Sequence, residues 1–124
     1  MDEDLKKKLA ADPDGLLTYE FLANNIGNVD DIMDEIIDNM IAVDHNGQFS
    51  VSAARYLNAI DSNKYAAYIS RLIAAAIEKD RERNYIAQLL PEIWGADYAA
   101  NAETLSAADD NFRRIYKRVF ATGI

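Results

Sequence analysis

Apolar positions recur with the period of an α-helix along most of the chain. The clearest stripe follows the i, i+3, i+4 rule over residues 29–41: Val29, Ile32, Met33, Ile36, Ile37, Met40 and Ile41. Similar stripes predict further helices around Leu5 and Leu9, from Tyr19 to Ile26, from about Asp61 to Ile77, over 84–94 and from Ser106 to Phe120, with Gly123 past the end. Clusters of turn residues separate several of these stripes, and residues 95–105 are expected to form a loop. The pattern predicts a mainly α, single-domain fold of five or six helices over residues 1–124.

The pattern changes near residues 41–52. The segment IAVDHNGQFSV reads as a short apolar strand, a turn with Asn46-Gly47 at its tip, and an alternating strand with Phe49 and Val51 on one face. Such a pattern is typical of a β-hairpin. A longer turn between two helices is the alternative interpretation.

Two turn clusters, at 12–15 and 44–47, also invite comparison with an EF-hand calcium loop. An EF-hand needs oxygen ligands at positions 1, 3 and 5, Gly at position 6 and Glu at position 12. With Gly15 or Gly47 at position 6, position 1 is Ala10 or Ala42, and position 12 is Phe21 or Ala53. Both loops lack two of the ligands, so we reject the EF-hand interpretation.

Residues 5–57 resemble a winged helix-turn-helix. The resemblance rests on Thr18, Leu22, Ala23 and Gly27, which fit a T-x-x-x-L-A-x-x-x-G pattern, and on a second group after the turn: Gly47, Phe49, Ala54, Arg55, Tyr56 and Leu57. It implies that residues 41–52 form the wing and that the preceding helix is a recognition helix. The chain would then consist of an acidic winged-helix-like part, 1–60, and a helical part, 61–124.

Charge argues against a DNA-reading surface on that helix. Residues 1–61 hold 13 acidic and 4 basic residues, whereas 62–124 hold 8 acidic and 9 basic residues. The predicted third helix exposes only acids, and counterion release on DNA requires several Lys or Arg contacts. An acidic face suits a protein partner better.

The inventory of chemical groups is small. The chain has no Cys, which excludes disulfides and a Cys nucleophile, and its one His, His45, lies in a turn. No nucleophile pattern or Gly-rich phosphate loop is present. We predict no enzyme activity, no cofactor and no metal site. No apolar run is long enough to span a membrane, and we expect a cytoplasmic location.

We therefore predict a non-enzymatic protein-interaction or regulatory module that binds a protein partner or forms a homo-oligomer such as a dimer. The candidate partner-binding residues form two charged surfaces. The acidic surface lies on the third helix and consists of Asp30, Asp31, Asp34, Glu35 and Asp38, and the basic surface lies on the last helix and consists of Arg113, Arg114, Lys117 and Arg118. Opposite charges on these two surfaces would allow salt-sensitive association. The alternative is a nucleic-acid-associated winged-helix factor, such as a transcriptional regulator or a phage or plasmid replication accessory protein.

Overall fold

The computed structural model describes residues 1–120, and this part of the chain consists of helices and turns, without a strand. The helices are α1 (Glu3–Ala10), α2 (Leu16–Asn25), α3 (Met33–Val43), α4 (Gln48–Asp61), α5 (Ala66–Lys79), α6 (Leu89–Trp94), α7 (Ala102–Ala108) and α8 (Asp110–Val119). Two short 3-10 helices, η1 (Asp30–Ile32) and η2 (Ile86–Gln88), precede α3 and α6. The predicted mainly α fold is confirmed.

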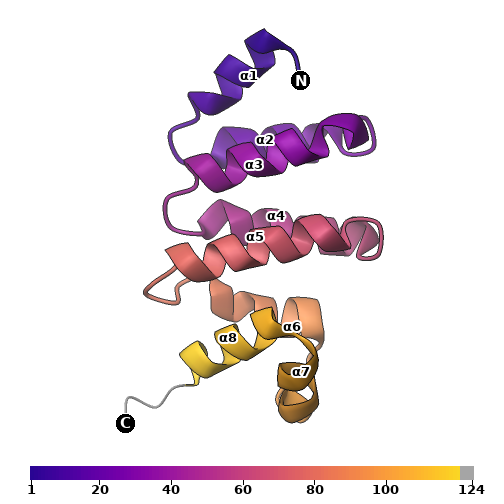
Figure 1. Ribbon diagram of the computed structural model, residues 1–124, viewed down its shortest axis with the longest axis vertical. Helices are drawn as coiled ribbons and strands as arrows, with labels where there is room; N and C mark the ends of the chain where they lie inside the picture. Colours follow the sequence, from indigo (N-terminus) through magenta and orange to yellow (C-terminus); the bar gives the residue numbers. More distant parts are fainter. Residues whose placement is uncertain (121–124) are drawn as a thin grey trace.

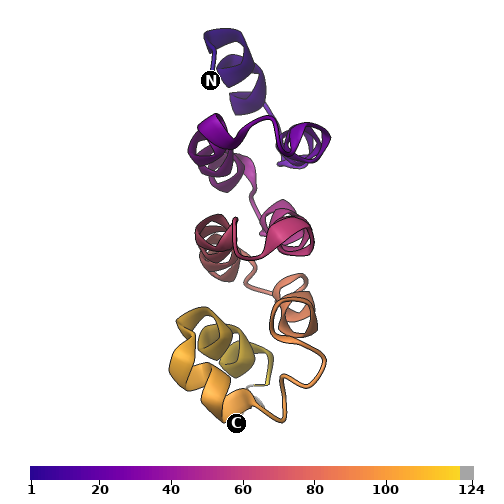
Figure 2. The same cartoon turned by 90° about the vertical axis from the view of Figure 1, so that its right-hand side faces the viewer.

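The helices stack in two columns along the long axis of the molecule (Figures 1 and 2). One column, the α4 layer, consists of α2, α4 and α6, and the other, the α5 layer, consists of α1, α3, α5 and α8. Neighbours within each layer contact one another, and α4 and α5 make the most extensive contact of all. α7 packs on α8 at the C-terminal end of the stack. Stacks in which each helix pair contacts only its neighbours are typical of helical repeat proteins.

A buried aspartate begins each of the first two full helix pairs. The Asp12 carboxylate accepts the backbone N–H of Gly15 at 2.9 Å and that of Thr18 at 2.7 Å. Asp44 does the same with Gly47 at 3.1 Å and Ser50 at 2.9 Å. Each carboxylate thereby pairs N–H groups at the start of a helix that would otherwise lack a partner. The pattern Asp-x-x-Gly-x-x-Thr/Ser is thus a repeated turn.

The third turn uses the same device in a modified form. Asp80 is 2% exposed and accepts the N–H groups of Asn84 at 2.9 Å, Tyr85 at 2.7 Å and Ile86 at 2.8 Å. A buried carboxylate therefore accepts backbone N–H groups just before or at the start of the η2–α6 segment, as it does at the starts of α2 and α4.

Side chains of the α5 layer join each helix to the one before it. Asn39 of α3 donates to the Leu9 carbonyl of α1 at 2.9 Å. Lys79 of α5 donates to the carbonyls of Ile41 and Asp44 at the end of α3, and Arg118 of α8 to that of Ile77 in α5. These donors satisfy carbonyls in the last turns of the preceding helices. Burial lowers the pKa of Lys79, and the Asp44 charge offsets this only in part.

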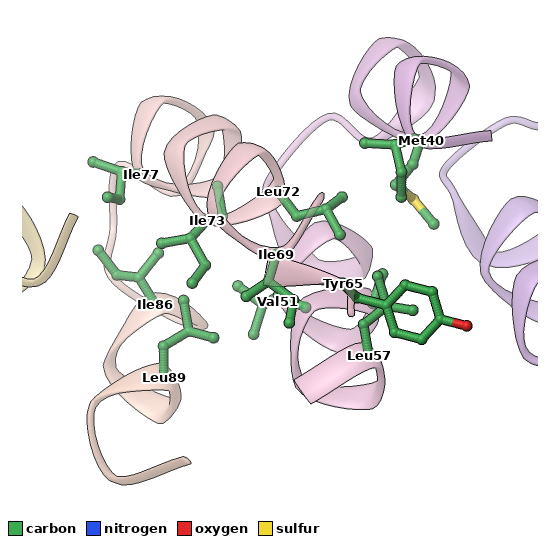
Figure 3. Packing of buried hydrophobic residues seen from close by; sticks show 14 of the residues in the cluster. Met40, Val51, Leu57, Tyr65, Ile69, Leu72, Ile73, Ile77, Ile86 and Leu89 are labelled. Atoms are coloured by element: carbon green, nitrogen blue, oxygen red, sulfur yellow. The ribbon is translucent and has the colours of Figure 1, made fainter. Parts of the chain in front are cut away.

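The core runs between the two layers along the stack. Figure 3 shows Leu72 of α5 pointing toward Met40 of α3, and Ile73 pointing toward Ile86 and Leu89. The stripe predicted for the third helix is buried at Met33, Ile36, Ile37 and Met40. Each fully buried side chain of this size contributes about 1.5–3 kcal/mol.

The predicted hairpin at 41–52 is wrong, and with it the wing that the resemblance implied. α3 continues to Val43 and α4 begins at Gln48. Asp44 explains the difference, because its carboxylate pairs the N–H groups of Gly47 and Ser50 and so starts a helix after the Asn-Gly turn. The alternation of Phe49 and Val51 is only the beginning of a helical stripe that continues through Ala54 and Leu57.

The predicted helix count of five or six is also wrong, because residues 1–120 contain eight α-helices. The hairpin interpretation omitted α4, which begins within residues 41–52, and α7 occupies part of the predicted loop at 95–105. The helix predicted from Ser106 to Phe120 is divided in two at Asp109. The extended backbone of Asp109 (φ −138°, ψ 111°) ends α7, and its side chain caps α8 by accepting the Phe112 N–H. Gly123, expected past the end of that helix, lies outside the described residues.

None of the described helices is long and apolar enough to cross a membrane.

Candidate protein-interaction face

The outer face of the α5 layer is rich in charge, and on α3, α5 and α8 most of the charged side chains are paired within the chain. Lys64 contacts Asp30 at 2.8 Å, and this hydrogen bond raises the pKa of Lys64. Arg71 of α5 bridges Asp34 and Asp38 of α3. The Arg71 contacts connect α5 to α3 and reduce the repulsion between Asp34 and Asp38, which lie one turn apart on α3. The Lys64 contact connects the turn between α4 and α5 to η1.

Seven of the nine predicted partner-binding residues make such contacts. Besides Asp30, Asp34 and Asp38, four others have partners in the chain: Glu35 with the N-terminal ammonium of Met1, Arg113 with Asp110, Arg114 with Glu78, and Arg118 with the Ile77 carbonyl. For Asp31 and Lys117, residues 1–120 supply no ion-pair partner. α5 lies between α3 and α8, so the acidic and basic surfaces do not form one site within the molecule.

The face of the α4 layer is different. Across its three helices only Glu20, Arg55, Asp61 and Glu92 carry charge. A shallow cleft of about 320 Å³ opens between these helices. We call its lining the tyrosine face, and it comprises Tyr19, Ser52, Arg55, Tyr56, Ala59 and Glu92.

Two tyrosines from successive helix pairs shape the tyrosine face. The rings of Tyr19 and Tyr56 meet edge to face with centroids 6.3 Å apart, and Tyr19 also packs on Phe49 at 6.4 Å. The Tyr56 hydroxyl donates to the Ala23 carbonyl at 3.3 Å. Both rings are half-buried, so each keeps an accessible surface while its orientation is held by neighbours.

Arg55 forms the other wall of the cleft. Its guanidinium donates to Gln88 at 2.8 Å and to Glu92 at 3.0 Å, and thereby connects α4 to the η2–α6 segment. These two partners fix the orientation of the guanidinium, and a group held in place in this way loses less entropy when it contacts a ligand.

Residues 1–120 contain no group of three His, Cys, Asp or Glu side chains placed to hold a metal ion. His45 is exposed, and its Nε2 lies 3.0 Å from the Pro13 carbonyl oxygen. Asp12 and Asp44 belong to the two turns that were compared with an EF-hand loop, and their carboxylate oxygens accept backbone N–H groups.

Comparisons of the chain with protein families, curated proteins and solved structures find no match.

Sequence reasoning did not place the tyrosine face. The winged-helix resemblance predicts that Arg55 and Tyr56 follow a hairpin, whereas the structure puts them in the middle of a 14-residue helix. The signal that could have revealed this is the repeated Asp-x-x-Gly-x-x-Thr/Ser motif at 12–18 and 44–50. Because the first copy precedes a helix, the second predicts one too.

Proposed function

We propose that this chain is a non-enzymatic protein-interaction module that binds its partner through the tyrosine face. The observation that carries this proposal is the contrast between the two layers. On α3, α5 and α8, most charged side chains contact a neighbouring helix, whereas the α4 layer presents aromatic rings and an arginine among few charges.

The composition of the tyrosine face suits the centre of a protein interface. Interface cores are depleted of charged residues and enriched in Tyr and Arg, and these residue types supply most of the residues that dominate binding energy. The cleft is shallow and spans helices of successive pairs, as in stacked-helix proteins that bind partners along an extended surface. A partner helix or loop fits such a surface better than a small substrate does.

Affinity capture from the native cell with matched variants tests the proposal. Ala59 is exposed and lines the cleft, so Ala59→Glu places a charge on the tyrosine face without disturbing the core. We expect a partner retained by the wild-type chain to be lost by Ala59→Glu. Lys117→Glu on α8 is the control, and it should retain the partner.

The reverse outcome, with loss by Lys117→Glu and retention by Ala59→Glu, would replace the tyrosine face with the basic surface predicted from sequence. Association of copies through the acidic and basic surfaces stays a prediction, which light scattering at low and high salt tests. The nucleic-acid-associated alternative also stays a prediction, which an anisotropy titration with DNA and RNA at low salt tests.

A further inference from the structure

A second cleft, of about 180 Å³, lies where the C-terminal ends of α4 and α6 meet the N-terminal ends of α5 and α8. Its walls are mostly apolar, with Ile69 and Ile73 from α5 and Ile93 and Trp94 from α6. Polar groups complete the lining: Asn58, Ser62, Ser70, Asp109 and Asn111. We call it the Trp94 cleft. At this size it is below the range of about 300–1,000 Å³ typical of small-molecule sites and is suited to one long side chain.

The charge that lines the Trp94 cleft is negative. Among residues 1–120, Asp109 is the single ionisable residue that lines it, and no Lys, Arg or His does. The Asp109 carboxylate is held in place because it accepts the Trp94 indole N–H at 3.0 Å and the Phe112 backbone N–H at 3.2 Å. The Trp94 ring is held in turn by an edge-to-face contact with Phe112 at 5.2 Å.

Both asparagines of the cleft donate to a backbone carbonyl. The Asn58 amide nitrogen donates to the Glu92 carbonyl at 3.3 Å, and the Asn111 amide nitrogen donates to the Ser70 carbonyl at 3.1 Å. A carbonyl partner can only accept, so it settles which end of each amide is the nitrogen. The amide oxygens are acceptors for a ligand that donates hydrogen bonds.

We propose that the Trp94 cleft receives a Lys or Arg side chain of a partner protein. These side chains combine an apolar stem with a cationic, donor-only head. The isoleucine walls fit the stem, while Asp109, the amide oxygens and the Trp94 ring fit the head through charge, hydrogen bonds and cation–π attraction. The net charge of −8 favours the approach of a basic partner. This site does not depend on the tyrosine face, because α4 contributes different residues to each.

The single tryptophan makes the test specific, because Trp94 gives the only indole N–H signal in an NMR spectrum. The probes are capped Ala-Arg-Ala and its neutral isostere Ala-citrulline-Ala, together with the matching pair that contains lysine and norleucine. We expect saturable shifts of the Trp94 signal with the arginine and lysine peptides and none with the neutral pair. Equal shifts with the neutral peptides, or no saturable shift, would overturn the proposal.

Two neighbouring aspartates supply matched variants. Asp109→Asn retains a helix-capping residue but removes the charge, and should weaken binding of the arginine peptide about tenfold or more. Asp110→Asn removes an adjacent charge that pairs with Arg113 outside the cleft, and should leave binding unchanged. A second variant, Ala66→Leu at the exposed rim, should block the cleft without altering Asp109. Equal loss in Asp109→Asn and Asp110→Asn, or unimpaired binding in Ala66→Leu, would contradict the assignment. Tighter binding of free putrescine than of either peptide would point to a small-molecule polyamine and overturn the protein partner.

Discussion

Arg83 holds, at φ 61°, the backbone position that Gly47 holds at φ 87° in the preceding turn. Each is the third residue after a buried aspartate, Asp80 and Asp44 respectively. The left-handed conformation costs an ordinary L-residue about 1–2 kcal/mol and costs glycine little. The third turn therefore retains the positive φ of the first two at this position, while it lacks the glycine best suited to it.

Arg83→Asn should stabilise the fold by about 0.5–1 kcal/mol, because Asn tolerates the left-handed region better than Arg does. The substitution also removes a 3.2 Å hydrogen bond from Arg83 to the Arg118 carbonyl, which is exposed and contributes little. Urea unfolding followed by circular dichroism measures the change. Arg81→Asn, two residues earlier and without a positive φ, is the control and should not stabilise. Destabilisation by Arg83→Asn would show that the guanidinium contact outweighs the backbone strain.

A pair of glycine substitutions separates backbone strain from close packing. Gly27 and Gly47 have nearly equal positive φ, 88° and 87°. A Cβ on Gly27 would meet nothing within 4 Å, whereas one on Gly47 would lie 3.2 Å from the Ala76 carbonyl oxygen of α5. Gly27→Ala should cost about 1 kcal/mol, and Gly47→Ala about 1–3 kcal/mol more. Urea unfolding of both variants measures the difference. Equal losses would mean that α5 shifts away from the α3–α4 turn at little cost.

The helical periodicity of single segments was readable from sequence, but the stacking of pairs was not. The stripe on α3 predicted the burial of Ile36 and Ile37, because periodicity alone decides which side of a helix is apolar. The alternation at Phe49 and Val51 is ambiguous over so few residues, and the decisive interaction is the hydrogen bonding of the Asp44 side chain. The candidate site could not be predicted from sequence for a similar reason. Charges on α3 stand out in sequence, yet Arg71, which neutralises two of them, lies more than thirty residues away.

Two cations of α5 should differ in what they contribute. Arg71 bridges Asp34 and Asp38 on the exposed surface, and such pairs contribute about 0–1 kcal/mol. Lys79 is half-buried and donates to two carbonyls at the end of α3. Lys79→Met leaves those carbonyls without that donor and should cost about 1–2 kcal/mol, whereas Arg71→Met should cost less. Urea unfolding of the two variants measures both losses.

Salt distinguishes the two mechanisms further. At about 1 M salt the screening length falls to about 3 Å, so the loss caused by Arg71→Met should disappear. The loss caused by Lys79→Met should persist, because it arises from hydrogen bonds to partly buried carbonyls. A loss in Lys79→Met that vanishes with salt would identify its role as purely electrostatic.

Acid should weaken the first turn through Asp12, whose carboxylate is 5% exposed. Burial alone raises the pKa of Asp12, but hydrogen bonds from the Thr18 hydroxyl and from the N–H groups of Gly15, Thr18 and Asp14 outweigh it, so the pKa lies below its ordinary value. The folded chain thus favours the ionised form more than the unfolded chain does. The resulting stability is fully present above the unfolded pKa of about 3.9 and is lost as the pH falls through the lower, folded value.

Asp12→Asn should cost about 1–3 kcal/mol at neutral pH, because the amide offers one acceptor oxygen where the carboxylate uses two. The difference in unfolding free energy between wild type and Asp12→Asn should shrink as the pH falls below 4, since protonation of Asp12 removes the advantage of the carboxylate. Urea unfolding of both chains from neutral to acidic pH measures this. Asp14→Asn is the control, because Asp14 is exposed and accepts only one hydrogen bond, from the Leu16 N–H, that Asn can also accept. A gap between wild type and Asp12→Asn that stays constant with pH would mean that the Asp12 charge does not stabilise the turn.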